Sequence, residues 1–448
     1  MAINLKRNRF NTKLVFGGLP LAALLLLSSS ASAQVITLDK SQTLDEKRTG
    51  WLPYIFSTDS LDTSIGVGGF TAGTIQPQAS LFGTGFVTAN ESALLSGSAN
   101  NFQLGDSDLI FDAFVLLDHF TDQRFYADLD NNLGQPKAGS NDSDQDDFIT
   151  GESDEFTLNL TLKYPLPIGA QTRSDSPFHI YTTDQGLLMS EPSGGKEWNP
   201  MTSGLTTIAT QFFYTYRNLS DYEANADELE AETNGLSFWL EYDNTDFKIN
   251  PSYGSRQQLI LSSDFGWGNS SNSWTNIQFD AAKYFNLGTS DWFKQKVLAL
   301  DFWTANTPSW ETDPDNPYIV SHRPPPSYGS ELGGFDRMRA YPSGRFHDKS
   351  AVYYAAELRF TPQFQEMSDW PIIKYFEVDW FQIVPFIEAG RVGPEYNSDL
   401  FVKDLKTSAG IGLRMMAFRA VVRLDVAVSD EGTSVWAMIK QPFSRFGG

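Results

Sequence analysis

The chain has 448 residues, no cysteine and a formal net charge of −22 at pH 7. This acidic balance argues against nucleic acid and anionic lipid headgroups as partners, because both demand clustered Lys and Arg. The lack of cysteine excludes disulfides and thiolate metal sites, so the fold depends on packing or on a membrane.

The first 33 residues have the three parts of a secretory signal peptide. Basic residues precede a mostly apolar run at 14–27, and Ala31-Ser32-Ala33 supplies small residues for cleavage. We expect residues 1–33 to be removed and residues 34–50 to form a short periplasmic segment. No run of 18 apolar residues follows, so no transmembrane helix is predicted.

Alternation of apolar and polar side chains recurs along the rest of the chain. In residues 234–243, Leu236, Phe238 and Leu240 share one face and Ser237 shares the other with Glu241, while Trp239 is an exception. Such a strand has one face suited to lipid and one suited to water. The same alternation also occurs in soluble β-sandwiches.

The pattern predicts about sixteen strands. In chain order the candidates are 62–72, 78–87, 108–118, 122–129, 155–165, 176–182, 205–217, 234–243, 255–266, 273–286, 294–305, 350–361, 380–391, 406–416, 418–428 and 433–443, and 51–57 is a weaker seventeenth. The spacing of about 26 residues per strand favours a membrane barrel over a sandwich, whose turns recur every 8 to 12 residues. We therefore predict an all-β fold, a transmembrane antiparallel β-barrel over residues 51–448.

Two long connections are polar. In residues 128–155, the spacing of Asp142, Asp144 and Asp146 is similar to that of a calcium loop, but Asp147 stands where that loop needs Gly. A solvated loop is the alternative, and we expect no metal or cofactor. Residues 306–336 form a Pro/Gly-rich connection, which at this length is typically functional or disordered.

The sequence predicts no enzyme. It has no nucleophile elbow, no His-Glu-x-x-His helix and no dinucleotide fingerprint. Its four histidines, His119, His179, His322 and His347, are isolated from one another in the sequence.

The segment GGFDRMRAYPSGRFHDKSAVYYAAELRF, residues 333–360, resembles the sixth-loop motif of the BamA/TamA-type outer-membrane barrels, the bacterial surface antigen family. In that family the motif is Val/Leu-Arg-Gly-Tyr/Phe, often followed by Gly-Arg-Phe-Arg-Asp. The matching residues here are Arg339, Ala340, Tyr341, Gly344, Arg345, Phe346 and Asp348. The segments YDNTDFKINPSYGSRQQLIL and FIEAGRV, and the closing strands to Phe443, resemble the family in the same order.

The resemblance implies a barrel whose long sixth extracellular loop folds into a water-filled lumen. Arg339 must then find an anion there, and we expect it to pair with Glu388 of FIEAGRV or with Asp425. A guanidinium can hold a carboxylate by two parallel hydrogen bonds, which would fix the loop in one orientation. The alternative is that Arg339 faces solvent.

Three features depart from the family. Ala340 replaces a glycine, so a positive φ at that position would require a local change of geometry. Four residues, 445–448, follow the expected terminal aromatic region at Phe443. Only residues 34–50 precede the first predicted strand, so we expect the family's periplasmic receiving domains to be absent.

The resemblance implies an integral protein of the outer membrane of a Gram-negative-type bacterium. Its expected partners are outer-membrane lipid and, for an active member, client outer-membrane proteins or the barrel assembly machinery. One function is membrane biogenesis, or polypeptide or lipid transport through a weakly paired seam. A passive channel or structural barrel is the alternative, and a secreted soluble β-protein is a third class.

An even strand count predicts that both termini lie in the periplasm. We also expect Trp51, Tyr54, Trp274, Tyr284 and Phe285 to lie near the two borders between lipid and water, where a ring can bury its body and keep a polar edge wet.

Overall fold

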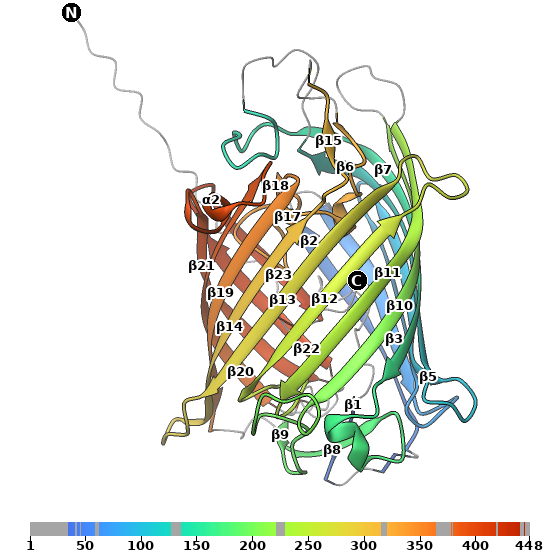
Figure 1. The fold of residues 1–448 in the computed structure, drawn as a ribbon, viewed down its shortest axis with the longest axis vertical. Helices are drawn as coiled ribbons and strands as arrows, with labels where there is room; N and C mark the ends of the chain where they lie inside the picture. Colours follow the sequence, from blue (N-terminus) through green and yellow to red (C-terminus); the bar gives the residue numbers. More distant parts are fainter. Residues whose placement is uncertain are drawn as a thin grey trace, which may run out of the picture.

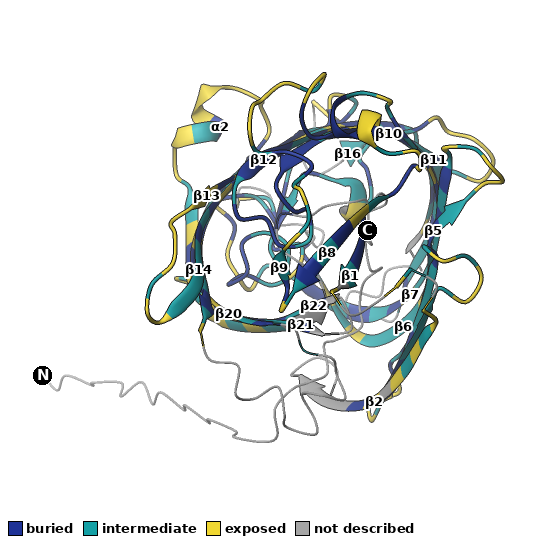
Figure 2. Ribbon diagram, turned by 90° about the horizontal axis from the view of Figure 1, so that it is seen from below, coloured by how far each residue is buried: buried dark blue, intermediate teal, exposed yellow. Residues whose placement is uncertain are grey.

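Sixteen strands form one continuous sheet that curls round on itself (Figures 1 and 2). The computed structural model describes residues 35–40, 43, 44, 46–58, 62–126, 136–220, 229–314, 320–363, 378, 380–417, 420–439 and 443. The predicted signal peptide lies outside these residues. Neighbouring strands of the sheet are antiparallel and follow one another in chain order, apart from short elements that lie outside it.

The strands of the large sheet are long. They are β2 Arg48–Thr58, β3 Asp62–Ala72, β4 Ser80–Thr88, β5 Ala93–Gln103, β6 Ile110–Phe125, β7 Ile149–Pro165, β10 Leu205–Ser220, β11 Leu229–Thr245, β12 Gly254–Asp264, β13 Trp274–Asn286, β14 Phe293–Asn306, β19 Ser350–Pro362, β20 Trp380–Gly393, β21 Lys406–Ala417, β22 Ala420–Val428 and β23 Thr433–Ile439.

The remaining elements are short. They are β1 Val35–Asp39, β8 His179–Asp184, β9 Leu187–Leu188, β15 Glu311–Thr312, β16 Val320–Ser321, β17 Glu331–Leu332, β18 Phe346–His347, the 3-10 helices η1 Gly169–Arg173 and η2 Pro326–Tyr328, and the helix α2 Ser398–Val402. Within the described ranges, none of the helices is long and apolar enough to cross a membrane.

The two faces of the sheet differ as the alternation predicts. On β11, Phe238 and Leu240 are 46% and 47% exposed on the convex face, whereas Ser237 and Glu241 are 1% exposed on the concave face. Trp239, the exception in the pattern, lies on the concave face opposite Ala209 of β10, which leaves room for the indole. An apolar convex face over a polar interior is the arrangement that a bilayer requires.

A small three-stranded sheet lies across one mouth of the large sheet (Figure 2). β1 pairs in parallel with β8, and β8 turns into β9 through Gln185 and Gly186, both of which have positive φ. A Cβ atom on Gly186 would lie 1.6 Å from the Trp380 ring, so the turn sits directly against β20. The β7–β10 connection therefore reaches from one wall to another across this mouth.

Most predicted strands are confirmed, with bounds that shift by a few residues. The prediction was wrong in three places. The segments 108–118 and 122–129 are largely one strand, β6; 176–182 overlaps β8, outside the large sheet; and β5, with the sequence ALLSGSANNFQ, was missed because its small polar residues alternate weakly.

The aromatic prediction was wrong for three of its five residues. Tyr54, Trp274 and Tyr284 are buried, whereas Trp51 and Phe285 are exposed. The buried rings fill the interior, where the Trp274 Nε1 donates to Thr233 Oγ1 at 2.9 Å and the Tyr54 hydroxyl lies 2.9 Å from Thr84 Oγ1. A polar edge of a ring is satisfied by the lumen wall as well as by a membrane border.

In the described part of the acidic connection between β6 and β7, residues 136–148, the carboxylates do not converge on one point. Asp144 Oδ1 accepts from the Asp146 backbone N–H, and Asp147 Oδ2 accepts from that of Asp144, so these side chains serve turns. Among the described residues, no group of three His, Asp or Glu side chains is arranged to hold a metal ion.

Candidate functional site

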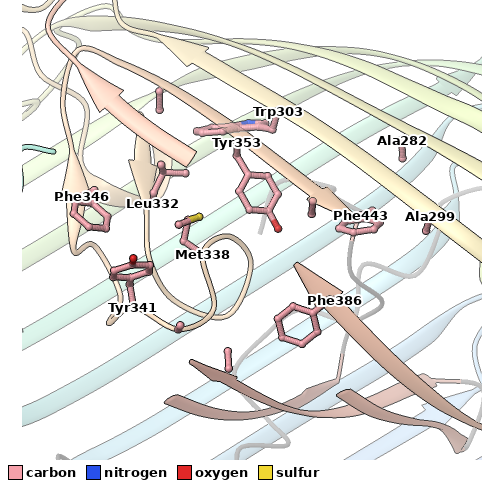
Figure 3. Packing of buried hydrophobic residues seen from close by; sticks show 14 of the residues in the cluster. Ala282, Ala299, Trp303, Leu332, Met338, Tyr341, Phe346, Tyr353, Phe386 and Phe443 are labelled. Atoms are coloured by element: carbon pink, nitrogen blue, oxygen red, sulfur yellow. The ribbon is translucent and has the colours of Figure 1, made fainter. Parts of the chain in front are cut away.

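The connection from β14 to β19 packs against the concave face of the sheet (Figure 3). Its residues Leu332, Met338, Tyr341 and Phe346 are at most 1% exposed and cluster with Tyr353 and other concave residues of β13, β14, β19, β20 and β22. The antiparallel pair of β17 and β18 forms the base of the inserted segment. This segment brings the predicted motif residues into the interior.

The tight turn in this segment does not need a glycine at the position of Ala340. Positive φ occurs at Met338 (56°) and at Gly344 (67°) but not at Ala340. Gly333 has its own requirement, because a Cβ there would lie 2.1 Å from the carbonyl oxygen of Pro342. The alanine that replaces the family's glycine at position 340 therefore introduces no backbone strain.

The turn presents Arg339 to two carboxylates. Its Nε lies 2.9 Å from Glu388 Oε1, and its Nη1 lies 2.9 Å from Asp425 Oδ2. All three side chains are buried, and the Phe386 ring lies 3.4 Å from the Arg339 Cζ. Burial alone would lower the pKa of the Arg339 guanidinium, but Glu388 and Asp425 hold it well above its usual range.

Glu388 receives four hydrogen bonds. The Arg339 backbone N–H and Nε donate to it at 2.7 and 2.9 Å, and the hydroxyls of Tyr353 and Ser408 donate at 2.6 Å each. These donors come from the loop, β19 and β21. A buried carboxylate with this many donors is held in one position, so the loop is bound by backbone as well as by charge.

Four further charged side chains, on neighbouring strands, surround Arg339 and its two carboxylates. Arg359 and Arg414 both donate to Glu357, at 3.0 and 2.6 Å, and Glu357 Oε1 lies 3.2 Å from Arg339 Nη2. Arg423 Nη1 lies 3.4 Å from Asp425 Oδ2. We call Arg339, Glu357, Arg359, Glu388, Arg414, Arg423 and Asp425 the ionic centre; four guanidinium groups face three carboxylates in it.

Arg345 makes a second attachment. Its Nε and Nη2 each lie 2.8 Å from an oxygen of Glu431, in the β22–β23 turn, while Nη1 and Nη2 also bond Ser143 of the β6–β7 connection. The two bonds to Glu431 have the fork geometry that arginine favours. The nearby His347 is buried, which lowers its pKa well below the usual range.

Other motif residues support the turn. The Tyr341 hydroxyl donates to Asp430 at 2.7 Å and Phe346 packs edge-on against the Tyr341 ring. Asp348 Oδ1 accepts from the Lys349 backbone N–H at 2.7 Å, at the entry to β19. Arg337 stacks 3.5 Å from the Trp303 ring. The segment is therefore held along its length.

The attachments concentrate on the last five strands. The carbonyl oxygens of Arg339 and Ala340 accept from Trp436 and Ser434 of β23, at 2.6 and 3.1 Å. Tyr328 of η2 reaches the opposite wall, where its hydroxyl donates to Asn159 of β7. The connection thus spans the interior and is fixed most firmly beside the final strand.

Phe443 lies in the same interior cluster. It is 4% exposed, and the Arg359 Cζ is 5.4 Å from its ring centroid. Residues 440–442 and 444–448 lie outside the described residues, so the predicted end of the closing strand at 443 is not tested beyond Ile439.

Sequence reasoning missed Glu357, Arg359, Arg414 and Arg423. A signal for them exists: each is a charged residue within a strand whose next neighbours on the convex face are apolar, as in AAELRF and GLRMM. A charge at such a position must point into the interior, where it needs a partner of opposite sign.

The family model described as the Omp85 superfamily domain matches residues 119–436. The chain belongs to the Omp85 superfamily. This membership places it among bacterial outer-membrane barrel proteins, in agreement with the family predicted from the sequence motifs.

Two solved structures also match this chain. One is BamA from Haemophilus ducreyi lacking POTRA domains 1–3, with 13% identity and a TM-score of 0.49 over 88% of this chain and 68% of that chain. Another is CdiB from Escherichia coli, with 9% identity and a TM-score of 0.49 over 87% of this chain and 61% of that chain. No curated protein sequence gives a significant match.

Proposed function

We propose that this Omp85 protein forms a closed barrel in the outer membrane and works in membrane biogenesis, or in the passage of polypeptide or lipid, through the seam between β2 and β23. In this proposal the β14–β19 connection is the superfamily's sixth extracellular loop. It is the sixth connection at its end of the sheet, counted from β2–β3.

The observation that carries this proposal is the attachment of the loop beside the seam. The ionic centre uses β19 to β22, and the turn also bonds β23. A loop that only narrowed a channel could be fixed anywhere on the wall. Attachment to the last five strands instead stiffens one side of the seam and leaves the first strands free to move against it.

Weak pairing at the seam supports the same function. Among the described residues, β2 pairs with β3 and β23 pairs with β22, and no backbone ladder joins β2 to β23. Val422 of β22 nevertheless packs against the cluster of Tyr54, Phe86 and Leu94, which belongs to β2, β4 and β5. The two ends of the sheet are therefore in contact through a side chain of β22, and side-chain contacts separate at lower cost than a ladder of hydrogen bonds.

The alternative is a passive channel or structural barrel, which the polar concave face favours. Two measurements on the purified protein separate these functions. Biogenesis predicts faster insertion of an unfolded outer-membrane client into vesicles that contain the protein, with little steady conductance in planar bilayers. Steady conductance without any effect on client insertion would assign the protein as a passive channel.

A further inference from the structure

A groove of about 1030 Å³ crosses the convex face of strands β12 to β22. One ladder row of the sheet runs along it, through Gln257, Ala281, Phe302, Tyr354, Ala389 and Thr407. The adjacent row runs from Lys283 through Leu300 and Ile387 to Val428, whose exposed side chains place the groove on the outside of the barrel. The groove is thus a feature of the surface that faces the bilayer.

The shape of the groove follows from small side chains set between large ones. Alanines at 281, 356, 389 and 409 leave the backbone accessible, while Phe302, Tyr354 and Ile387 form its sides. Seven strands at about 4.8 Å spacing give a slot on the order of 30 Å long. A slot of this length and apolar lining suits an extended acyl chain.

The two ends of the groove differ in charge. Lys283 is exposed at the end nearest the β11–β12 turn, and Asp430 lies at the other end. An anionic group is therefore attracted to the Lys283 end and repelled from the Asp430 end. The net charge of the whole chain argues against a broad surface for anionic lipids, but a site for one headgroup needs only one cation in the right place.

A tryptophan from outside the sheet lies over the Lys283 end. Trp198 belongs to the β7–β10 connection, and its Nε1 donates to Gln257 Oε1, a groove residue, at 3.0 Å. Its ring packs edge-on against Tyr242, yet the side chain is 70% exposed, and nearby Met201 is 63% exposed. An exposed indole at a barrel rim is typical of the boundary between headgroups and acyl chains.

We propose that the groove binds one phospholipid, with its phosphate at Lys283 beside Trp198 and an acyl chain along the slot. The chain lies in the groove because the convex face is in contact with lipid, and Lys283 sets the direction in which the lipid lies. The site depends on membership of the barrel superfamily but not on any cargo of the seam, so it is tested without a client protein.

The test is native mass spectrometry of the full chain in detergent. The probes are dimyristoyl phosphatidylglycerol and dimyristoylglycerol, which share acyl chains and differ by the phosphate headgroup. We expect one retained phosphatidylglycerol. Lys283→Gln should reduce its retention relative to dimyristoylglycerol by about fivefold, the effect of one cation on an anionic lipid. Ala356→Leu fills the slot and should abolish retention of both lipids.

Two controls match these variants. Lys296→Gln removes a cation of β14. Lys296 lies four residues before Leu300, about 13 Å along the strand toward the rim, and is outside the groove. Ala113→Leu enlarges an alanine on β6, also away from the groove. Both should retain lipid like the native chain, and all variants must show native heat-modifiable migration.

Equal retention of the two probes by the native chain would overturn the proposal, as would equal losses in Lys283→Gln and Lys296→Gln. A further contrary outcome comes from light scattering. If the native chain is a dimer and Ala356→Leu makes it a monomer, the groove is an interface between two copies of the chain and not a lipid site.

Discussion

The Arg339 guanidinium is a buried charge whose partners come from different strands. Its removal therefore tests how much the ionic centre stabilises the fold. Arg339→Ala leaves the carboxylates of Glu388 and Asp425 buried without the Arg339 guanidinium. Glu388→Ala leaves the buried Arg339 without one of its carboxylate partners. Each variant should lower the free energy of unfolding by about 3 to 5 kcal/mol, less where lumen water screens the charges. Both substitutions remove the same Arg339–Glu388 contact, so the double variant should lower the free energy of unfolding by clearly less than the sum of the two single variants. Urea unfolding of the protein in vesicles measures these free energies.

Arg391 provides the matched control for Arg339. It also pairs with a carboxylate, Asp404 at 3.1 Å, but this partner is 76% exposed on its side chain. Arg391→Ala should therefore cost at most about 1 kcal/mol. Equal losses for Arg339→Ala and Arg391→Ala, or additive losses in the double variant, would contradict a buried anchor.

At the residue scale, the sequence predicted those members of the ionic centre that belong to recognisable motifs. Arg339, Glu388 and Asp425 were named because short segments resemble the family, and the structure places them together. Glu357, Arg359, Arg414 and Arg423 were missed, because strand pairing over long sequence separations decides which interior charges meet. Alternation gives the face of a residue but not its cross-strand neighbour.

The small sheet at the mouth has a pH sensitivity of its own. His179 of β8 is half-buried near Arg173, and the loss of hydration together with that positive charge lowers its pKa to about 4, while the pKa in an unfolded chain is near 6.5. The folded sheet therefore keeps His179 neutral, and its stability is complete above pH 6.5 and falls as the pH drops toward 4. By pH 5 these pKa values correspond to a loss of about 2 kcal/mol, which the partial exposure of the ring reduces to on the order of 1 kcal/mol. We expect to see the loss as faster amide exchange in β1 and β8 after correction for intrinsic rates.

The contribution of His179 is isolated by substitution. In His179→Gln the pH dependence of exchange in β1 and β8 should disappear, because the titrating group is gone. His119→Gln on β6 is the control, since His119 is partly exposed beside Asp154 and lies outside the small sheet. If His179→Gln keeps the native pH dependence, another group is responsible.

The turn of the β8–β9 hairpin tests whether the small sheet limits passage through the mouth. Gly186 and Gly288 have similar positive φ, 72° and 77°, so alanine strains both backbones by about 1 kcal/mol. Only Gly186 meets a neighbour, because its Cβ would lie 1.6 Å from Trp380, whereas nothing lies within 4 Å at Gly288. Gly186→Ala should therefore displace the hairpin and raise conductance in planar bilayers.

Gly288→Ala supplies the comparison. It should leave conductance at the native level, since strain without a clash does not move the hairpin. Equal conductance for Gly186→Ala and Gly288→Ala would mean that the hairpin does not restrict the mouth. Faster amide exchange in β9 of Gly186→Ala would verify that the substitution moved it.

At the scale of elements, long alternating strands were predictable and short or weakly patterned ones were not. β19, β20 and β21 were predicted within two residues at each end, because most of their convex residues are apolar. β5 carries Ser96, Ser98 and Asn100 on the face toward the polar interior and Gly97 on the convex face, so its alternation of apolar and polar residues is weak. β8 alternates like a barrel strand, yet its register is set by β1, which no local pattern reveals.

For the whole molecule, the even strand number has a geometric consequence. With sixteen antiparallel strands, the start of β2 and the end of β23 lie at the same end of the sheet, which is the end that carries the small sheet. Strand number could be predicted from length and spacing. Closure and the state of the seam could not, because they depend on the meeting of residues near the two ends of the chain.

The seam can be tested in this chain because it has no cysteine. Val422→Cys combined in turn with Tyr54→Cys, Phe86→Cys or Leu94→Cys brings two thiols into one cluster. At least one pair should react with a short dithiol crosslinker, and in a barrel that works through its seam the link should stop client insertion, with recovery after the linker is cleaved. Val422→Cys with Ala113→Cys is the unlinked control. Crosslinking that leaves insertion unchanged would show that the seam does not open, and failure of all three pairs would show that the two edges do not meet.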